Sequence, residues 1–147
     1  MLEKLLQTNH DHVCLLLRVV AGVIIFPYGM QKLFGWFNGP SIKGTLEDLK
    51  SNKNLPLFIA WLIIIGQSLG SIALILGFLG RIAAGGNFVI FTGALIVHSP
   101  DGWMLNWFNK KNGEGIEYFV LLLALLLVVI IKGSGALSVD LWLLDKI

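Results

Sequence analysis

Four apolar segments alternate with polar connections along the chain. The first covers about Cys14 to Phe34, and the second covers about Pro56 to Leu79. At a rise of ~1.5 Å per residue, each is long enough to cross a hydrocarbon core of ~30 Å. Pro56 stands where the first turn of a helix tolerates proline, and Gly80 follows the segment as a stop signal. These two segments predict membrane-spanning helices.

The other two apolar segments are shorter. The third covers residues 82–98 and contains a "GGN" interruption at 85–87, and the fourth covers residues 116–132. Glu117 and Lys132 stand near the ends of the fourth segment, where charged side chains can extend to the lipid headgroups. Taken alone, either segment could also be a buried or re-entrant helix. Taken together, they complete an even number of spans, which places both termini on one side of the membrane.

Three connections separate the four segments. The "LGR" stretch at residues 79–81 leaves almost no room between the second and third segments, which predicts an antiparallel helix hairpin. The other two connections, residues 36–55 and 99–115, are long and leave the same end of the bundle. Tryptophans and phenylalanines gather at that end, as expected for an aromatic belt at headgroup depth. Residues 102–109 ("GWMLNWFN") predict a short interfacial segment that lies on the membrane after the third span.

The composition supports a membrane protein. Of the 147 residues, 56% are hydrophobic and 14% are charged, whereas a soluble domain carries about a quarter charged residues. The net charge of +2 is small and dispersed, which argues against a nucleic-acid partner. Basic residues are divided almost evenly between the two ends, so charge does not fix the orientation. We therefore expect an all-α polytopic membrane protein with a single transmembrane domain over residues 1–147. Its antiparallel bundle of four helices would span about 14–34, 56–79, 82–98 and 116–132.

Several kinds of chemistry are not visible in the sequence. Cys14 is the only cysteine, so no dithiol–disulfide exchange occurs within the chain, and we expect a small buried apolar residue. His10 and His12 lie two residues apart near the N-terminus, and His98 has no second histidine at helical spacing, so no metal site is expected. There is no nucleophile motif, phosphate-binding glycine loop or haem-attachment motif. We expect no catalysis by the chain alone and no tightly bound cofactor.

Polar residues inside the apolar segments are the candidate site. In the first segment, Tyr28, Gln31 and Lys32 fall on one stripe of the helix directly after Pro27, which can bend it. Polar groups within a membrane are costly, so each requires a partner or a purpose. Because the polar residues converge at the end that faces the long connections, we expect one polar ligand-binding pocket there. Its candidate residues are Tyr28, Gln31, Lys32, Gln67, His98 and Glu117.

A structural interpretation of the same residues stays open. Gln67 would then be a plain hydrogen-bond partner between helices, because buried polar groups usually find such partners. Lys32 would extend to the lipid headgroups, and His98 would lie at headgroup depth near the aromatic belt. Glu117 would cap its helix, where the helix dipole favours a carboxylate, or form a salt bridge with Lys32.

Small and polar residues also predict where the helices pack together. Gly66 and Gly70 are four positions apart in the second segment, so they allow another helix to approach closely. Ser71 shares a face with Gly70, and Asn87 offers a hydrogen bond between helices from the third segment. The expected packing residues are Gly66, Gly70, Ser71 and Asn87.

Six motifs follow one another in a characteristic order. The first three are "LRVVAGVIIFPYGMQKLFGWF" at the first segment, "GPSIKGT" after it, and "GQSLGSIALILGFLGRIAA" across the tight hairpin. The last three are "VHSPDGW", "EYFVLLLALLL" and "GSGALSVD". In this order and spacing, the chain from about Leu16 to Asp140 resembles the DoxX family of small bacterial and archaeal membrane proteins.

Individual positions also bear on this resemblance. Two of them differ from the family pattern: family members often carry histidine where this chain has Tyr28, and glutamate where it has Gln67. Both replacements keep hydrogen-bonding capacity but lose an ionisable group. The positions that match the usual pattern are Lys32, His98, Glu117 and Asp140.

The resemblance implies a location and a set of functions. It implies a bundle of four transmembrane helices in the cytoplasmic membrane of a bacterium or an archaeon, with both termini in the cytoplasm. Some relatives resemble subunits of a thiosulfate–quinone oxidoreductase, and others are associated with redox defence. We therefore expect an accessory subunit of a membrane-bound oxidoreductase or respiratory-type complex, with quinone as the contacted cofactor.

Two alternatives to this function stay open. One is a purely structural subunit of a larger membrane complex, and the other is a protein that binds or transports a small solute or a lipid. The expected partners are the lipid bilayer, other membrane-protein subunits and, as an alternative, further copies of the chain in a homo-oligomer. Nucleic acid is not an expected partner.

Overall fold

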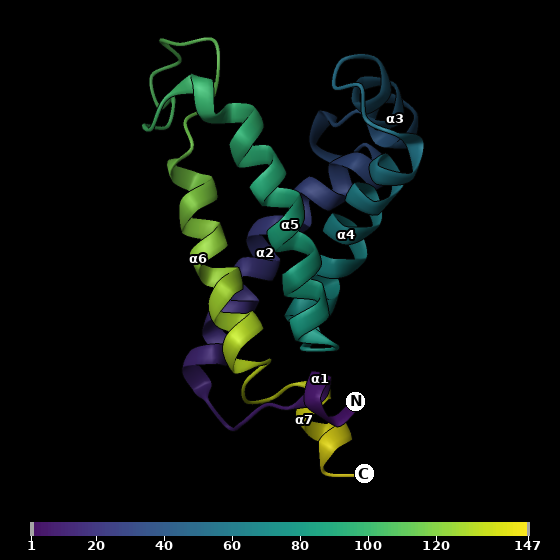
Figure 1. Cartoon of the computed structure of the whole chain (residues 1–147), viewed down its shortest axis with the longest axis vertical. Helices are drawn as coiled ribbons and strands as arrows, with labels where there is room; N and C mark the ends of the chain where they lie inside the picture. The colour runs from purple at the N-terminus through teal and green to yellow at the C-terminus, as the bar shows by residue number, and fades with distance from the viewer. Residues whose placement is uncertain (1, 147) are drawn as a thin grey trace.

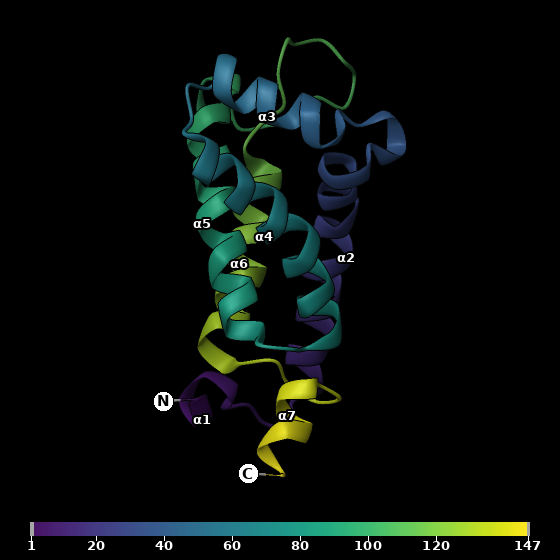
Figure 2. The same cartoon turned by 90° about the vertical axis from the view of Figure 1, so that its right-hand side faces the viewer.

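The computed structural model describes residues 2–146, and the regular elements in this range are helices. Four long helices run alongside one another and form the body of the molecule (Figure 1). They are α2 (His12–Phe34), α4 (Leu57–Leu76), α5 (Gly80–His98) and α6 (Glu117–Lys132). The short helices α1 (Leu2–Leu6) and α7 (Val139–Leu144) lie at the end that holds both termini, and α3 (Ser41–Ser51) lies across the opposite end (Figure 2). Two 3-10 turns, Trp36–Asn38 and Ser99–Asp101, follow α2 and α5.

The four long helices pack in a closed order around a common apolar core. Helix α2 packs mainly on α4, and α5 packs mainly on α6. Contacts of α4 with α5 and of α2 with α6 complete the bundle. The outer surface is also apolar, since Phe58 in α4 is 72% exposed and Val89 in α5 is 71% exposed. The core residues are Ala21, Ile25, Leu74, Ala84, Phe91, Leu122, Leu126 and Val129.

Three helices are long and apolar enough to cross a membrane. These are α2, α4 and α5 with its 3-10 extension to Asp101, with mean hydropathies of 2.1, 2.2 and 1.5. The expectation of an all-α protein with membrane-spanning helices is therefore confirmed. Helix α6 contains only 16 residues, which corresponds to about 24 Å, so the fourth span stays a prediction.

Helix α2 has well-defined ends. The Asp11 carboxylate accepts hydrogen bonds from the backbone N–H groups of Val13 (2.8 Å) and Cys14 (3.3 Å). These bonds, that of Val13 first, lower the pKa of the Asp11 carboxyl below its usual value. The helix continues without interruption through Pro27 and ends at Gly35, whose φ of +74° suits a residue without a Cβ atom.

Two local features differ from the sequence expectation, and the prediction of an interfacial segment at residues 102–109 stays a prediction. Helix α5 begins at Gly80 and continues through residues 85–87, so the "GGN" stretch does not interrupt it. The connection 36–55 contains the 11-residue helix α3, which apolar length alone could not reveal because much of its surface is polar. Residues 102–109 form turns and irregular structure, and the Trp107 and Phe108 side chains within them are exposed.

A buried cation ties three segments together near the termini. Arg18 in α2 is only 1% exposed. Its guanidinium donates hydrogen bonds to the carbonyl oxygens of Leu74 (2.9 Å) and Ile75 (2.5 Å) in α4. It also donates to three carbonyl oxygens in the segment 134–137, which follows α6. A buried guanidinium requires such partners for its donors, so Arg18 has a structural role.

A buried carboxylate fastens the α4–α5 hairpin to the same C-terminal segment. Asp140, in the first turn of α7, is 1% exposed. It accepts hydrogen bonds from the backbone N–H groups of Leu79 (2.6 Å) and Gly80 (2.9 Å) and from the hydroxyl of Ser134 (2.5 Å). The "GSGALSVD" segment at residues 133–140 therefore holds the hairpin and α2 in place.

Candidate functional site

Two tyrosines lie against each other between α2 and α6, toward the end of the bundle that carries α3. The ring centroids of Tyr28 and Tyr118 are 6.1 Å apart. The Nζ atom of Lys32 lies 5.9 Å from the centroid of the Tyr28 ring, because residues four positions apart share one face of a helix. The structure thus brings the predicted residue Tyr28 to a tyrosine of α6, and it places Lys32, also predicted, beside the Tyr28 ring.

A second set of aromatic contacts continues from α6 to α5. Phe119 stacks on the His98 ring with a centroid distance of 5.4 Å and an interplanar angle of 17°. Phe119 also lies 6.3 Å from Phe91 and 5.3 Å from Tyr118 between ring centroids, distances typical of interacting rings. Predicted residues of α2 and α5 are therefore linked through α6. The aromatic cluster consists of Tyr28, Phe91, His98, Tyr118 and Phe119.

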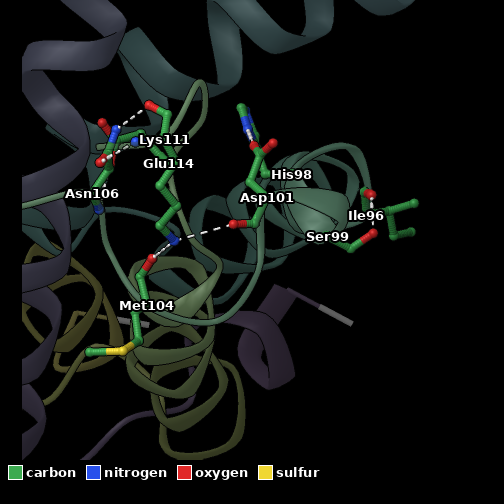
Figure 3. Close-up of polar contacts among 8 residues, drawn as sticks. All are labelled: Ile96, His98, Ser99, Asp101, Met104, Asn106, Lys111 and Glu114. Atoms are coloured by element: carbon green, nitrogen blue, oxygen red, sulfur yellow. Dashed lines mark hydrogen bonds and ion pairs between the residues drawn. The ribbon is translucent and has the colours of Figure 1, made fainter. Parts of the chain in front are cut away.

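His98 has an acidic partner at the surface of the bundle. Its Nδ1 atom lies 2.8 Å from Oδ2 of Asp101, three residues further along the chain (Figure 3). The side chains are 39% and 29% exposed, respectively. Lys111 donates from Nζ to the backbone oxygens of Asp101 and Met104, which folds the connection back toward this pair (Figure 3). The imidazole is thus oriented on one side by Asp101 and on the other by the ring of Phe119.

Two donors, one in the aromatic cluster and one beside it, have no hydrogen-bond partner within the described chain. The hydroxyl of Tyr118 is buried and lies near that of Tyr28, but it makes no hydrogen bond of good geometry with any described residue. Lys32 is half-buried, and its ammonium group has neither an ion pair nor a hydrogen bond among residues 2–146. A buried polar group without a partner is unusual in a folded protein. These two groups are available to a ligand that accepts hydrogen bonds.

The two predicted glutamines have different positions. Gln67 in α4 is 5% exposed, and its Oε1 atom has no hydrogen-bond partner among the described residues. The backbone of Gln67 lies directly against Gly29, the neighbour of Tyr28. A Cβ atom added to Gly29 would come within 2.4 Å of the backbone oxygen of Gln67. Gln31 is half-buried, and its backbone packs against Gly39 at the end of the bundle. Gln67 thus lies beside α2, whereas Gln31 lies beside Gly39.

Glu117 does not pair with Lys32 in the described structure. Its side chain is exposed, and Oε2 accepts a long hydrogen bond of 3.4 Å from the backbone N–H of Leu105. Its own N–H donates to the oxygen of Trp103 at 3.0 Å. Glu117 therefore attaches the connection 99–116 to the first turn of α6, and the expected salt bridge is absent from residues 2–146.

The predicted packing residues lie where α4 meets α5 and α2. Asn87 donates from Nδ2 to the oxygen of Gly66 at 2.9 Å, and a Cβ atom on Gly70 would lie 2.6 Å from the same nitrogen. Gly66 packs against Ile90, with only 2.5 Å between its Cβ position and Cδ1. The Ser71 hydroxyl bonds to the oxygen of Ser68, one turn earlier in α4, at 2.8 Å.

Sequence reasoning missed four residues that the structure adds to the site, namely Phe91, Asp101, Tyr118 and Phe119. Tyr118 and Phe119 follow Glu117 directly, and Tyr118 is one of only two tyrosines in the chain. Asp101 lies three residues after His98, a spacing that brings side chains together on one turn of helix. The sequence could not reveal Tyr118 and Phe119 as site residues, because it does not show which face of α6 turns inward.

The arrangement combines aromatic ring faces with hydrogen-bond donors. No group of three or more His, Cys, Asp or Glu side chains within the described residues could hold a metal ion. The aromatic cluster offers ring faces, and Tyr118 and Lys32 offer unused donors beside them. Such a combination suits a flat ligand with acceptor oxygens.

The helices and the polar site together define a class of protein. An all-helical chain with three apolar helices of spanning length is a multi-pass membrane protein whose outer surface contacts lipid. Residues 13–99, more than half of the chain, match the model of the DoxX family. The chain belongs to the DoxX family, as the order of its motifs predicted. Comparisons with curated proteins and with solved structures found no match.

Proposed function

We propose that the chain is a four-span membrane protein that binds the ring of a quinone, as an accessory subunit of a membrane-bound oxidoreductase. Helix α6 is the fourth span in this proposal, since Glu117 and Lys132 at its two ends can extend to the headgroups on both sides. Both termini then lie on one side of the cytoplasmic membrane. The resemblance to DoxX proteins implies that this side is the cytoplasm.

The observation that carries the proposal is the pair of unused donors beside the aromatic rings. Quinone carbonyl oxygens accept hydrogen bonds, and the Tyr118 hydroxyl and the Lys32 ammonium group have no other acceptor among the described residues. A planar quinone ring stacks favourably on aromatic side chains such as Tyr28. Because the surrounding helices are apolar, the isoprenoid tail of the quinone stays in the bilayer.

The proposal assigns binding to this chain and electron transfer to a partner subunit. His98 and Asp101 form a hydrogen-bonded pair at the surface end of the aromatic cluster, where a partner could approach. Exposed aromatic residues surround this end, including Trp103, Trp107 and Phe108. The chain would thus present a quinone near headgroup depth to a redox-active subunit.

The test uses the purified protein in lipid nanodiscs with ubiquinone-1, a short-tailed quinone. Replacing Tyr118 by Phe removes one hydroxyl without changing the ring, so the affinity for ubiquinone-1 should fall about tenfold, which corresponds to the loss of one hydrogen bond. The melting temperature should stay the same or rise, because the hydroxyl has no partner in the chain. Isothermal titration calorimetry measures the affinity.

Lysine substitutions provide a matched control. The variant Lys32→Gln should weaken binding of ubiquinone-1 severalfold, because the half-buried ammonium group is lost. The variant Lys53→Gln changes an exposed lysine on the connection at the same end and should bind like the unmodified protein. Equal affinities of the Tyr118→Phe, Lys32→Gln and unmodified proteins would contradict the quinone site.

A second candidate function, a structural subunit of a larger membrane complex, is favoured by three glycines of α5. Added Cβ atoms on Gly85, Gly86 and Gly93 would meet nothing within 4 Å, although glycine weakens a helix by about 1 kcal/mol relative to alanine. No contact within the described chain explains their small size. Helices of different membrane proteins often meet at such small residues.

If α5 binds other subunits at these glycines, a bulky residue in their place should prevent that binding. The variant Gly86→Leu should fold normally, since the position faces open space, but should lose proteins that copurify with the unmodified chain in mild detergent. Quantitative mass spectrometry of the two purifications provides the measurement. Identical sets of retained proteins would argue against a partner at Gly86.

A further inference from the structure

An open groove runs along α4 and α5, which lie side by side in the bundle (Figure 2). Its volume of about 1280 Å³ exceeds the ~300–1,000 Å³ of an ordinary small-molecule site. The residues that line it are apolar or glycine, and they extend from Leu55, before α4, to Leu79, at the turn into α5. The 20 residues of α4 correspond to about 30 Å, the thickness of the hydrocarbon core. The groove therefore extends across the membrane.

Large side chains form the α4 wall of the groove. They recur at alternating intervals of four and three residues, which keeps them on one face of the helix. Each of them is at least 37% exposed, so the described chain leaves this face largely uncovered. These residues are Phe58, Leu62, Ile65, Leu69 and Ile72.

The α5 wall has the same intervals, but every second residue is glycine. Its residues are Ile82, Gly86, Val89 and Gly93. A Cβ atom on Gly86 or Gly93 would meet nothing within 4 Å, and Val89 between them is 71% exposed. Glycine is unfavourable inside a helix, and no contact within the described chain requires it at these two positions. The α5 wall thus has two hollows.

Contacts between α4 and α5 show which residues lie at the same depth in the bundle. Asn87 Nδ2 donates to the oxygen of Gly66 at 2.9 Å and lies 2.6 Å from the Cβ position of Gly70. The Cβ position of Gly66 is 2.5 Å from Cδ1 of Ile90. Residues 66–70 of α4 therefore lie level with residues 87–90 of α5, which runs in the opposite direction.

This register places a large α4 residue level with each glycine of the α5 wall. Leu69 and Gly86 differ in depth by only about 2 Å, since each residue of a helix advances ~1.5 Å along its axis. Leu62 lies one turn before the contact region of α4, and Gly93 lies about one turn after that of α5. The second pair is therefore level as well.

We propose that the groove is the interface with a second copy of the chain, related to the first by a two-fold axis along the membrane normal. Copies inserted in the same orientation form a closed dimer only about an axis of this direction. The axis keeps every residue at its depth, so Leu69 and Leu62 of one copy meet Gly86 and Gly93 of the other. Each α4 then packs on the α5 of the other copy, and the four helices form an antiparallel bundle.

Two observations favour a copy of the chain over other occupants. A lipid tail covers only one leaflet and adapts to any apolar surface, whereas helices in a membrane require small residues where they approach closely. The match in depth between the large and the small wall is the self-complementarity that two identical surfaces require. The proposal does not depend on the quinone site, and it assigns the α5 glycines of the second candidate function to a copy of the chain.

Energy transfer between labelled copies in liposomes tests the interface. The full chain carries Cys14→Ala and Lys53→Cys, and separate batches receive a donor or an acceptor dye at this exposed position. Energy transfer that falls with added lipid along a monomer–dimer curve gives the association constant. The variant Gly86→Leu should lower this constant about tenfold or more, because its side chain occupies the space of Leu69 from the other copy.

The variant Gly85→Leu is the matched control. Gly85 also meets nothing within 4 Å, but it does not line the groove, so this variant should associate like the unmodified protein. The double variant Leu69→Ala, Gly86→Leu should recover most of the association, because a small residue then faces the large one across the interface. A protein of different sequence in the groove would not produce this recovery.

Disulfide formation tests the same contact without a bulky residue. The variants Leu69→Cys and Gly86→Cys, each in a Cys14→Ala background, are mixed in liposomes and oxidised with copper phenanthroline. They should form a mixed dimer, whereas Leu69→Cys mixed with Gly85→Cys should form little.

Absence of energy transfer between unmodified copies overturns the proposal, and so does equal association of the Gly86→Leu and Gly85→Leu variants. Loss of copurifying proteins from Gly86→Leu without energy transfer between copies would reject the dimer and retain the second candidate function. Binding of ubiquinone-1, measured with Tyr118→Phe, is decided independently of either result.

Discussion

The polar residues within the helices fall into two groups that differ in their hydrogen bonding. Arg18 and Asp140 are each 1% exposed, and both are surrounded by backbone partners. Tyr118 and Gln67 each retain an oxygen without a partner among the described residues. A satisfied buried group stabilises a fold, whereas an unsatisfied one lowers its stability unless a ligand completes it. This difference separates structural residues from candidates for binding.

Because Arg18 is buried and its donors have partners, we expect the Arg18→Leu variant to lose much of its stability. The substitution leaves five carbonyl oxygens without the donors that now bind them, so the free energy of unfolding should fall by roughly 3 kcal/mol or more. Cys14, the only cysteine, is 1% exposed and reports unfolding through its reaction with a thiol-specific fluorophore. Heating the protein in detergent with this dye gives the midpoint temperature of unfolding.

Arg81 provides the comparison for Arg18. It also donates to backbone oxygens, those of Gln7 and Ile130, but lies at a partly exposed position. Because water or headgroups can replace an exposed donor, Arg81→Leu should shift the midpoint much less. Similar shifts in both variants would show that burial of Arg18 does not determine its contribution.

Among the elements, the pair α2–α4 has the closest backbone approach in the bundle body. A Cβ atom added to Gly29 would come within 2.4 Å of the backbone oxygen of Gln67. A Cβ atom added to Gly22 would come within 2.7 Å of the Ile75 side chain. The small residues of α2 thus permit the close contact between Gly29 and the backbone of Gln67. By contrast, the glycines at 85, 86 and 93 of α5 meet nothing within the described chain.

This contrast predicts opposite effects of two alanine substitutions. Gly29→Ala should destabilise the protein by roughly 2 kcal/mol, because the methyl group overlaps backbone atoms that cannot move independently. Gly93→Ala should be neutral or stabilise by about 0.5–1 kcal/mol, since alanine favours the helix and the space is open. The thiol-reactivity midpoint measures both changes, and equal effects would refute the close α2–α4 contact.

At the scale of the whole molecule, the two termini lie together at one end and α3 lies across the other (Figure 2). The connection 99–116 leaves the bundle at the α3 end, and α6 returns the chain to the end with the termini (Figure 1). If α6 crosses the membrane as proposed, the two ends of the bundle face opposite sides of the membrane.

The fourth span predicts which positions a membrane-impermeant reagent can reach. In a Cys14→Ala background, the variants Lys53→Cys and Lys110→Cys should react with the reagent in only one of two preparations, inverted vesicles or right-side-out vesicles. A single cysteine at Lys146 should be labelled only from the other side, because α6 separates it from Lys110. Labelling of Lys110→Cys and Lys146→Cys from the same side would exclude a spanning α6.

Much of this architecture can be predicted from local sequence features. Apolar length identified the first three spans, the short "LGR" connection predicted the hairpin between α4 and α5, and the order of the motifs predicted the family. Helix α3 could not be predicted this way, because an amphipathic helix of 11 residues lacks a long apolar run. The "GGN" stretch suggested an interruption, but its neighbours support a continuous helix.

The sequence by itself determined the membrane class, because the apolar content of long segments depends only on composition and order. Only the tertiary structure decided which polar groups have partners. Arg18 looked like an ordinary basic residue until the segment 134–137, more than a hundred positions away, supplied its acceptors. Tyr118 was inconspicuous until α6 turned it toward Tyr28. Hydrogen bonds and ring contacts between helices depend on rotation and distance in space, which local sequence does not contain.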